Sequence, residues 1–95
     1  MADFSLNSSR LSFFNRMRSY QSRRGVVNFW ANDGAREVSF YVTAGALKLL
    51  DPRLRSDEDG FLQALDTHRG RIEDAANKVY RPGAQSSYEL DLPHF

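Results

Sequence analysis

The chain contains no cysteine among its 95 residues. This absence excludes disulfide frameworks, thiolate nucleophiles, iron–sulfur clusters and all-cysteine zinc sites. The chain also lacks any apolar run near the roughly 20 residues that a membrane helix needs, and no secretory signal opens it. We therefore expect a soluble protein without membrane contact. The absence of cysteine is compatible with any compartment and favours a reducing cytoplasm, which is the location we expect.

Motifs of the common enzymatic sites are missing as well. The six glycines match neither the dinucleotide-binding pattern nor the P-loop pattern. No helical H-E-x-x-H arrangement exists for His68 and His94, the two histidines of the chain. The acidic run at 57–59 lacks the other ligands of a calcium loop, and helix capping explains it. The sequence predicts no enzyme, no cofactor and no metal site, and leaves open an active site shared between subunits.

The net charge of +1 conceals an uneven distribution along the chain. Residues 1–25 carry five arginines and one aspartate, a net +4, whereas residues 51–95 carry six basic and nine acidic residues, a net −3. Arginines interleaved with aromatic residues can contact phosphate and stack on single-stranded nucleic acid. An acidic protein, or the acidic half of the chain itself, suits the same charges. The candidate residues are Arg16, Arg18, Arg23 and Arg24.

The segment 26–43 carries the strongest structural signal in the sequence. Apolar residues alternate on both sides of Asp33-Gly34, a dipeptide that tolerates the positive φ angles of a type I′ turn. The pattern predicts a β-hairpin with these two residues in the turn. In that register Trp30 pairs with Glu37.

The alternation gives the hairpin two different faces. The apolar face is expected to join the core and consists of Val27, Phe29, Val38, Phe40 and Val42. The other face combines Trp30 and Tyr41 with polar groups. Aromatic side chains gathered in one exposed patch are typical of an interface. They are structural instead if Tyr88, the first strand or arginine stems cover them.

Short strands are predicted before and after the hairpin. Residues 11–14 are expected to form the first strand, and residues 15–25 a surface loop. Residues 87–92 alternate again and predict a last strand, with Leu92 among its inward side chains.

Two helices are predicted between the hairpin and the last strand. Thr43 is placed to cap a short helix over 44–50, which must end before Pro52. Ser56 is placed to cap one long helix of about 22 residues. Its apolar stripe is Phe61, Leu65, His68, Ile72, Ala76 and Val79. Gly70 lies away from this stripe, where either another backbone approaches it or it has no structural role.

These elements predict one α+β domain over residues 11–92. A small, mostly antiparallel sheet holds the hairpin and the two short strands, and the short and long helices pack on one of its faces. Residues 1–10 are expected to be a flexible leader, and residues 93–95 a frayed tail. The serine- and arginine-rich segment that extends to Arg24 also resembles an organellar transit peptide in composition.

The adjacent pair His68-Arg69 is a weak candidate for a ligand-binding or catalytic site. His68 falls on the apolar stripe of the predicted long helix, where a part-buried imidazole bonded to a carboxylate is the ordinary structural explanation. Arg69 has Asp66 and Glu73 within helical reach as ion-pair partners.

The chain resembles a small bacterial family of domains of unknown function, numbered fourteen-eighty-eight. The residues that carry the resemblance are Phe13, Phe14, Tyr20, Val27 to Trp30, Asp33-Gly34, Glu37 to Thr43, Ala46-Leu47, Phe61, His68-Arg69, Ile72 and Ala76. The resemblance implies a compact α+β fold in a bacterial, cytoplasmic setting, and it implies no activity or cofactor.

The sequence thus favours a non-enzymatic interaction or regulatory protein. It would bind a protein partner, or a second copy of itself as a homo-oligomer, through the hairpin face with Trp30 and Tyr41. The alternative is weak nucleic-acid binding by the arginine-rich segment.

Overall fold

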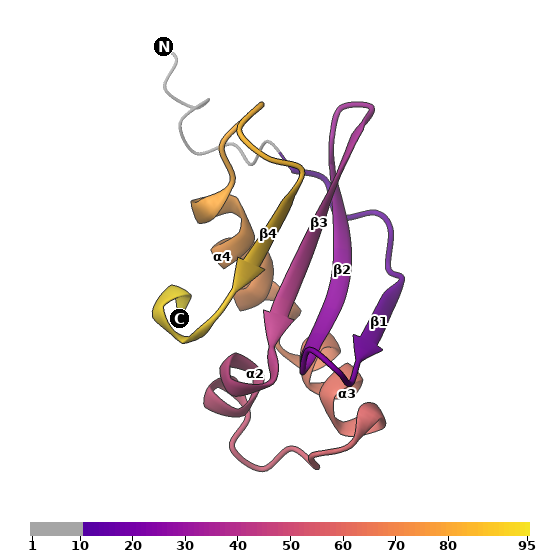
Figure 1. Cartoon of the computed structure of the whole chain (residues 1–95), viewed down its shortest axis with the longest axis vertical. Coiled ribbons are helices and arrows are strands. Elements are labelled where there is room, and N and C mark those ends of the chain that lie inside the picture. Colours follow the sequence, from indigo (N-terminus) through magenta and orange to yellow (C-terminus); the bar gives the residue numbers. More distant parts are fainter. Residues whose placement is uncertain (1–10) are drawn as a thin grey trace.

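The computed structural model describes residues 11–95, so the expected leader over residues 1–10 lies outside the described residues. The strands are β1 (Arg18–Gln21), β2 (Val26–Asp33), β3 (Arg36–Thr43) and β4 (Ser87–Leu90) (Figure 1). The helices are α2 (Ala44–Leu50), α3 (Glu58–Thr67), α4 (Arg69–Val79) and the 3₁₀ helix η1 (Leu92–His94).

The strands form one sheet in the order β1-β2-β3-β4. Strands β1, β2 and β3 are antiparallel neighbours, whereas β4 joins β3 in parallel. A parallel pair requires the chain to return to the same end of the sheet, and α2, α3 and α4 make up this connection. The predicted α+β class with a mostly antiparallel sheet is confirmed.

The hairpin of β2 and β3 is present, but its turn differs from the prediction. Asp33 is the last residue of β2 and pairs with Arg36, so the turn residues are Gly34 and Ala35. Gly34 has a φ of 62°, and no residue other than glycine has a positive φ in the described chain. One positive φ at the first turn position is the type II′ arrangement, whereas type I′ needs two.

The shifted turn also changes the register of the hairpin. Trp30 lies opposite Ser39 and not, as predicted, opposite Glu37. Because the displacement is two residues, which is the side-chain period of a strand, every side chain stays on its predicted face. The inward side chains of both strands are fully buried: Val27, Phe29, Ala31, Val38, Phe40 and Val42.

The first strand begins later than predicted. Ser12 forms only an isolated bridge with Asn32, through two backbone hydrogen bonds of 2.8 and 2.9 Å. The prediction of a strand over residues 11–14 is therefore wrong. Strand β1 lies within the segment predicted to be a loop. It contributes one aromatic side chain to the core, Tyr20, whose ring stacks on Phe61 at 5.2 Å. A strand with one apolar residue, Tyr20, and one charged residue, Arg18, on its inward face gives too little hydrophobic periodicity for detection from sequence.

Helix α2 has the bounds that the sequence predicts. The Thr43 hydroxyl accepts a hydrogen bond from the N–H of Ala46 at 3.1 Å, which satisfies one of the free donors of the first turn. The helix ends at Leu50, one residue before the Asp51-Pro52 dipeptide.

Helix α3 begins at a close approach to the preceding loop. Its N-cap is Asp57 and not Ser56, because the Asp57 carboxylate accepts the N–H of Gly60 at 2.8 Å. A Cβ atom on Gly60 would overlap the backbone carbonyl of Arg55. Glycine at this position therefore permits the loop to fold back against the helix.

The predicted long helix is broken into α3 and α4 at His68, whose φ of −106° and ψ of 24° leave the helical range. Backbone hydrogen bonds from His68 to Ala64 and from Ile72 to His68 keep the helical repeat in phase across the break. This continuity explains why the sequence shows one uninterrupted stripe. Gly70, just after the break, weakens the helical preference there. A Cβ on Gly70 would have no atom within 4 Å, so no backbone approaches it.

The C-terminal residues are ordered by the side chain of Asp91. Its Oδ1 accepts hydrogen bonds of 2.8 Å from the Thr43 hydroxyl and from the N–H of Leu92. The Asp91 N–H donates to Nδ1 of His94 at 2.9 Å. Pro93 and His94 of the expected frayed tail thus lie in η1, and Phe95 is its C-cap. Leu92 is 50% exposed and not inward, since the strand has already ended at Leu90.

The hydrophobic core lies between one face of the sheet and the helices. Figure 1 shows α4 behind β3 and β4, and no described helix crosses the sheet face that is turned toward the viewer. The helices contribute nine residues to the buried cluster: Ala46, Leu47, Leu50, Phe61, Ala64, Leu65, Ile72, Ala75 and Ala76. No helix within residues 11–95 is long and apolar enough to span a membrane.

Candidate functional site

The sheet face opposite α3 and α4, here called the open face, carries Trp30 and Tyr41. Tyr41 lies directly opposite Asn28, and Trp30 follows two residues further along β2, so the two aromatic residues are diagonal neighbours. They lie closer together than the predicted register implied. Both are part-buried, so each retains some surface for a contact.

Part of the open face is already desolvated. Val26 and Asn28 belong to this face, yet they are only 1% and 5% exposed. The side-chain amide of Asn28 donates to the carbonyl oxygens of Phe40 at 2.9 Å and Phe29 at 3.3 Å. A buried amide with its donors satisfied fixes the surface beside the two aromatic residues.

The ring of Tyr41 is covered on one side by Arg24. The guanidinium carbon of Arg24 lies 4.4 Å from the ring centroid, in a cation–π contact. Cover by an arginine is the structural alternative that the sequence left open for this pair, and it applies to Tyr41. Trp30 has no cation–π contact with the described residues, so it is the better candidate anchor of the open face.

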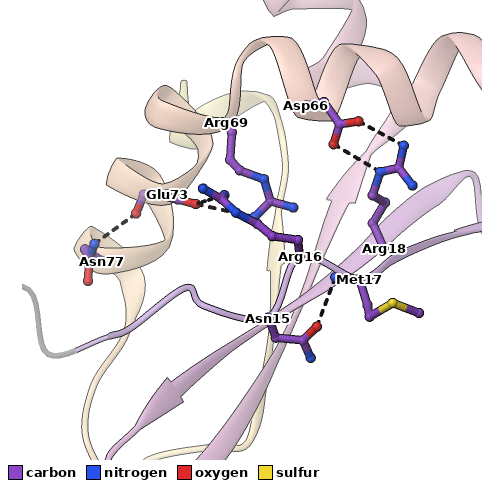
Figure 2. Close-up of polar contacts among 8 residues, drawn as sticks. All are labelled: Asn15, Arg16, Met17, Arg18, Asp66, Arg69, Glu73 and Asn77. Atoms are coloured by element: carbon purple, nitrogen blue, oxygen red, sulfur yellow. Dashed lines mark hydrogen bonds and ion pairs between the residues drawn. The ribbon is translucent and has the colours of Figure 1, made fainter.

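Arg18 lies on the opposite, helix-covered side of the sheet. Its Nε and Nη2 donate to Oδ1 and Oδ2 of Asp66 at 3.0 and 2.9 Å (Figure 2). This bidentate pair joins β1 to α3 and neutralises both charges. Arg18 therefore has a structural partner in the folded protein.

Arg16 and Arg69 share a second carboxylate on α4. Nη1 of each arginine approaches the same oxygen, Oε2 of Glu73, at 3.5 Å for Arg16 and 3.3 Å for Arg69 (Figure 2). The Arg16 side chain is 68% exposed, whereas that of Arg69 is 11% exposed. Next to them is an open hollow of about 330 Å³, lined by Arg16, Asp66 and Arg69.

The four arginine candidates do not form one basic surface. Arg16 and Arg18 contact the helices, and Arg24 packs on the open face. Arg23 is exposed in the turn between β1 and β2. A nucleic-acid strand needs cations along a shared track, and this arrangement disperses them.

His68 has the ordinary structural partner that its position suggested, but from another element. Its Nε2 lies 3.6 Å from Oδ2 of Asp51, which joins the break between α3 and α4 to the end of α2. Among residues 11–95, no group of three or more histidine or acidic side chains could hold a metal ion.

The structure exposes two large side chains that the sequence did not single out. Phe14 is 72% exposed and Met17 is 68% exposed, both in the segment between the Ser12 bridge and β1. Phe14 was expected to be inside the first strand. An apolar residue next to an edge strand carries no sequence signal that distinguishes exposure from burial.

Hydrogen bonds shift two pKa values outside these sites. The Tyr80 hydroxyl donates to Asp33 at 2.6 Å. This bond is the main cause, and burial a smaller one, of a Tyr80 pKa above its ordinary value of 10.0. The hydrogen bond from Thr43, followed by the N–H of Leu92, lowers the pKa of Asp91 below its ordinary value of 3.8. Both contacts join segments that are distant in the sequence.

Comparisons with known proteins agree with this fold. The crystal structure of a protein of unknown function from Shewanella loihica PV-4 superposes with a TM-score of 0.70 at 15% identity, covering 87% of this chain and 96% of that chain. No curated protein matches the chain. The family model described as "Protein of unknown function (DUF1488)" matches residues 11–92. The chain therefore belongs to the DUF1488 family.

Proposed function

We propose that this protein is a non-enzymatic interaction protein that binds a protein partner, or a second copy of itself, through the open face. The observation that carries the proposal is the one-sided cover of the sheet, since α3 and α4 pack on the face opposite Trp30 and Tyr41. An antiparallel sheet can leave one face in water, but such a face is ordinarily polar. Two aromatic residues on it favour an interface.

The surroundings of Trp30 suit a binding anchor. Interface hot spots are enriched in tryptophan, tyrosine and arginine, and they lie beside desolvated, well-ordered groups. Here Asn28 is buried and hydrogen-bonded, and the guanidinium of Arg24 packs over the ring of Tyr41. A partner would thus meet a preorganised surface, which lowers the entropy lost on binding.

The test is molar mass by light scattering after size exclusion, over a range of protein concentrations. Trp30→Ala should abolish association and leave the fold intact. Leu49→Ala is the matched control, because Leu49 is an exposed apolar residue on α2, with 52% exposure. A wild type that stays monomeric and binds no protein would remove the proposal, as would a Trp30→Ala variant that associates like the wild type.

The proposal also takes the protein as a cytoplasmic one that needs no cofactor or metal. Its support is the sequence, which lacks a cofactor loop, a nucleophile with its base and cysteine ligands.

Nucleic-acid binding by the arginine-rich segment is the less favoured function. Arg18 is neutralised by Asp66, and Arg24 lies on another face than Arg16. Binding to phosphate backbone would weaken steeply with salt, because each neutralised phosphate releases counterion. A mass increase with short single strands that disappears in moderate salt would restore this alternative.

A further inference from the structure

We infer that the hollow beside Arg16 and Arg69 is a binding site for a single phosphate group on a small molecule. The site lies between the chain segment before β1 and the junction of α3 and α4. It is on the helix-covered side of the sheet, so it is distinct from the open face and does not depend on the proposed interface.

The arginine–carboxylate cluster around the hollow has more hydrogen-bond donors than acceptors. Both oxygens of Asp66 are engaged by Arg18 at 2.9 and 3.0 Å. Arg16 and Arg69 are left to share one oxygen of Glu73, at 3.5 and 3.3 Å. Strong charge-assisted bonds are about 2.7 to 2.9 Å long, so neither arginine is well paired.

One end of the Arg69 guanidinium is buried without a hydrogen-bond partner among residues 11–95. Its Nη2 is buried and has no hydrogen-bond partner in the described chain. The guanidinium carbon lies 5.8 Å from the centroid of the Phe29 ring, which is a weak substitute for an acceptor. A buried charged donor without an acceptor is unfavourable, and a ligand is one of the ordinary explanations for such a group.

Phosphate supplies what the cluster lacks. It offers several terminal oxygens in place of one shared carboxylate oxygen, and a guanidinium binds it in a bidentate manner. Arg16 is exposed enough to turn toward a ligand, and the side chain of Glu73 must be displaced for Arg69 to follow. Glu73 thus acts as the internal competitor of the phosphate.

The size and charge of the hollow favour a small ligand over a polymer. Its volume of about 330 Å³ is near the lower end for small-molecule sites. Three arginines face two carboxylates here, an excess of one positive charge. The remaining cations lie elsewhere, so the site can hold one phosphate group but gives no track for a strand.

The experiment is titration of the full chain with inorganic phosphate at constant ionic strength, followed by NMR signals of the arginine side chains. Saturable shifts should appear at Arg16 and Arg69. Arg16→Gln should weaken binding by about tenfold or more, because charge-assisted hydrogen bonds are lost. Arg23→Gln is the matched control, since it removes the same charge from an exposed position outside the hollow.

The Glu73→Gln variant tests directly whether Glu73 competes with phosphate for the two arginines. Removal of the competing charge should tighten phosphate binding several-fold, whereas a merely structural Glu73 would leave the affinity unchanged or weaken it. The absence of saturable shifts, or an equal loss in Arg16→Gln and Arg23→Gln, would overturn the inference. So would a short single strand that binds more tightly than phosphate and loses its binding in salt. Trp30→Ala should leave phosphate binding unchanged, which separates this site from the open face.

Discussion

The hydroxyl group of Tyr80 joins the end of α4 to the hairpin by one hydrogen bond to Asp33. Tyr80→Phe removes this bond and should lower the free energy of unfolding by about 1 to 2 kcal/mol. The raised pKa of Tyr80 means that the folded state favours the protonated phenol. Its contribution is complete below the unfolded pKa near 10 and is lost as the pH rises through the higher folded value.

Urea unfolding at neutral and alkaline pH measures this effect. The wild type should lose stability above pH 10 more steeply than Tyr80→Phe. Tyr41→Phe is the control, because the Tyr41 hydroxyl bonds none of the described residues. Equal neutral stability of Tyr80→Phe and the wild type would show that the bond to Asp33 contributes nothing.

Asp91 gives the opposite pH dependence. Its lowered pKa means that the folded state favours the carboxylate, so its contribution is present above the unfolded value of 3.8 and is lost as the pH falls through the lower folded value. Urea midpoints between about pH 5 and pH 2 should therefore fall less in Asp91→Asn than in the wild type. Identical acid slopes in the two proteins would contradict this role.

Two helical glycines, Gly60 and Gly70, make a matched pair at the scale of elements. A methyl group on Gly60 would overlap the Arg55 carbonyl, whereas one on Gly70 would meet open space. Gly60→Ala should thus destabilise the protein by about 1 to 3 kcal/mol despite the better helix propensity of alanine. Gly70→Ala should stabilise it by up to about 1 kcal/mol. Thermal unfolding measures both, and shifts of the same sign would contradict the packing around Gly60.

Local patterns predicted the elements that depend on local chemistry. The Thr43 cap and the proline after Asp51 define α2, and the period of two places each hairpin residue on its correct face. The turn was misplaced because Asp33-Gly34 also permits a turn one residue later. The break at His68 was missed because the helical repeat stays in phase across it.

The two candidate sites differ in how far they depend on the whole fold. The open face was predicted from alternation alone, because its members come from two adjacent strands, whereas the arginine contacts join distant segments. Arg18 and Asp66 are 48 positions apart, and they meet only because β1 packs beside α3. No spacing rule in the sequence identifies such a pair. The i,i+4 spacing did predict the contact of Arg69 with Glu73, but not that Arg16, 57 positions away, approaches the same carboxylate.

At the scale of the molecule, the sheet separates the two candidate surfaces. Helices cover one face, with the arginine–carboxylate cluster at its border, and the proposed partner would bind the open face. Substitutions in one surface should leave the other unaffected, because they share no side chain. Trp30→Ala should change only the association of the protein, and Arg16→Gln should change only phosphate binding. A double variant should show the sum of the two effects on molar mass and phosphate affinity.

The most direct test of the open face uses Trp30, which is the only tryptophan of the chain. Its emission spectrum and its quenching by acrylamide should be measured on the wild type across the concentrations at which the molar mass rises. The account predicts a shift of the emission to shorter wavelength and weaker quenching as association proceeds. A rise in mass with unchanged emission and unchanged quenching would contradict it, because the interface would then lie elsewhere.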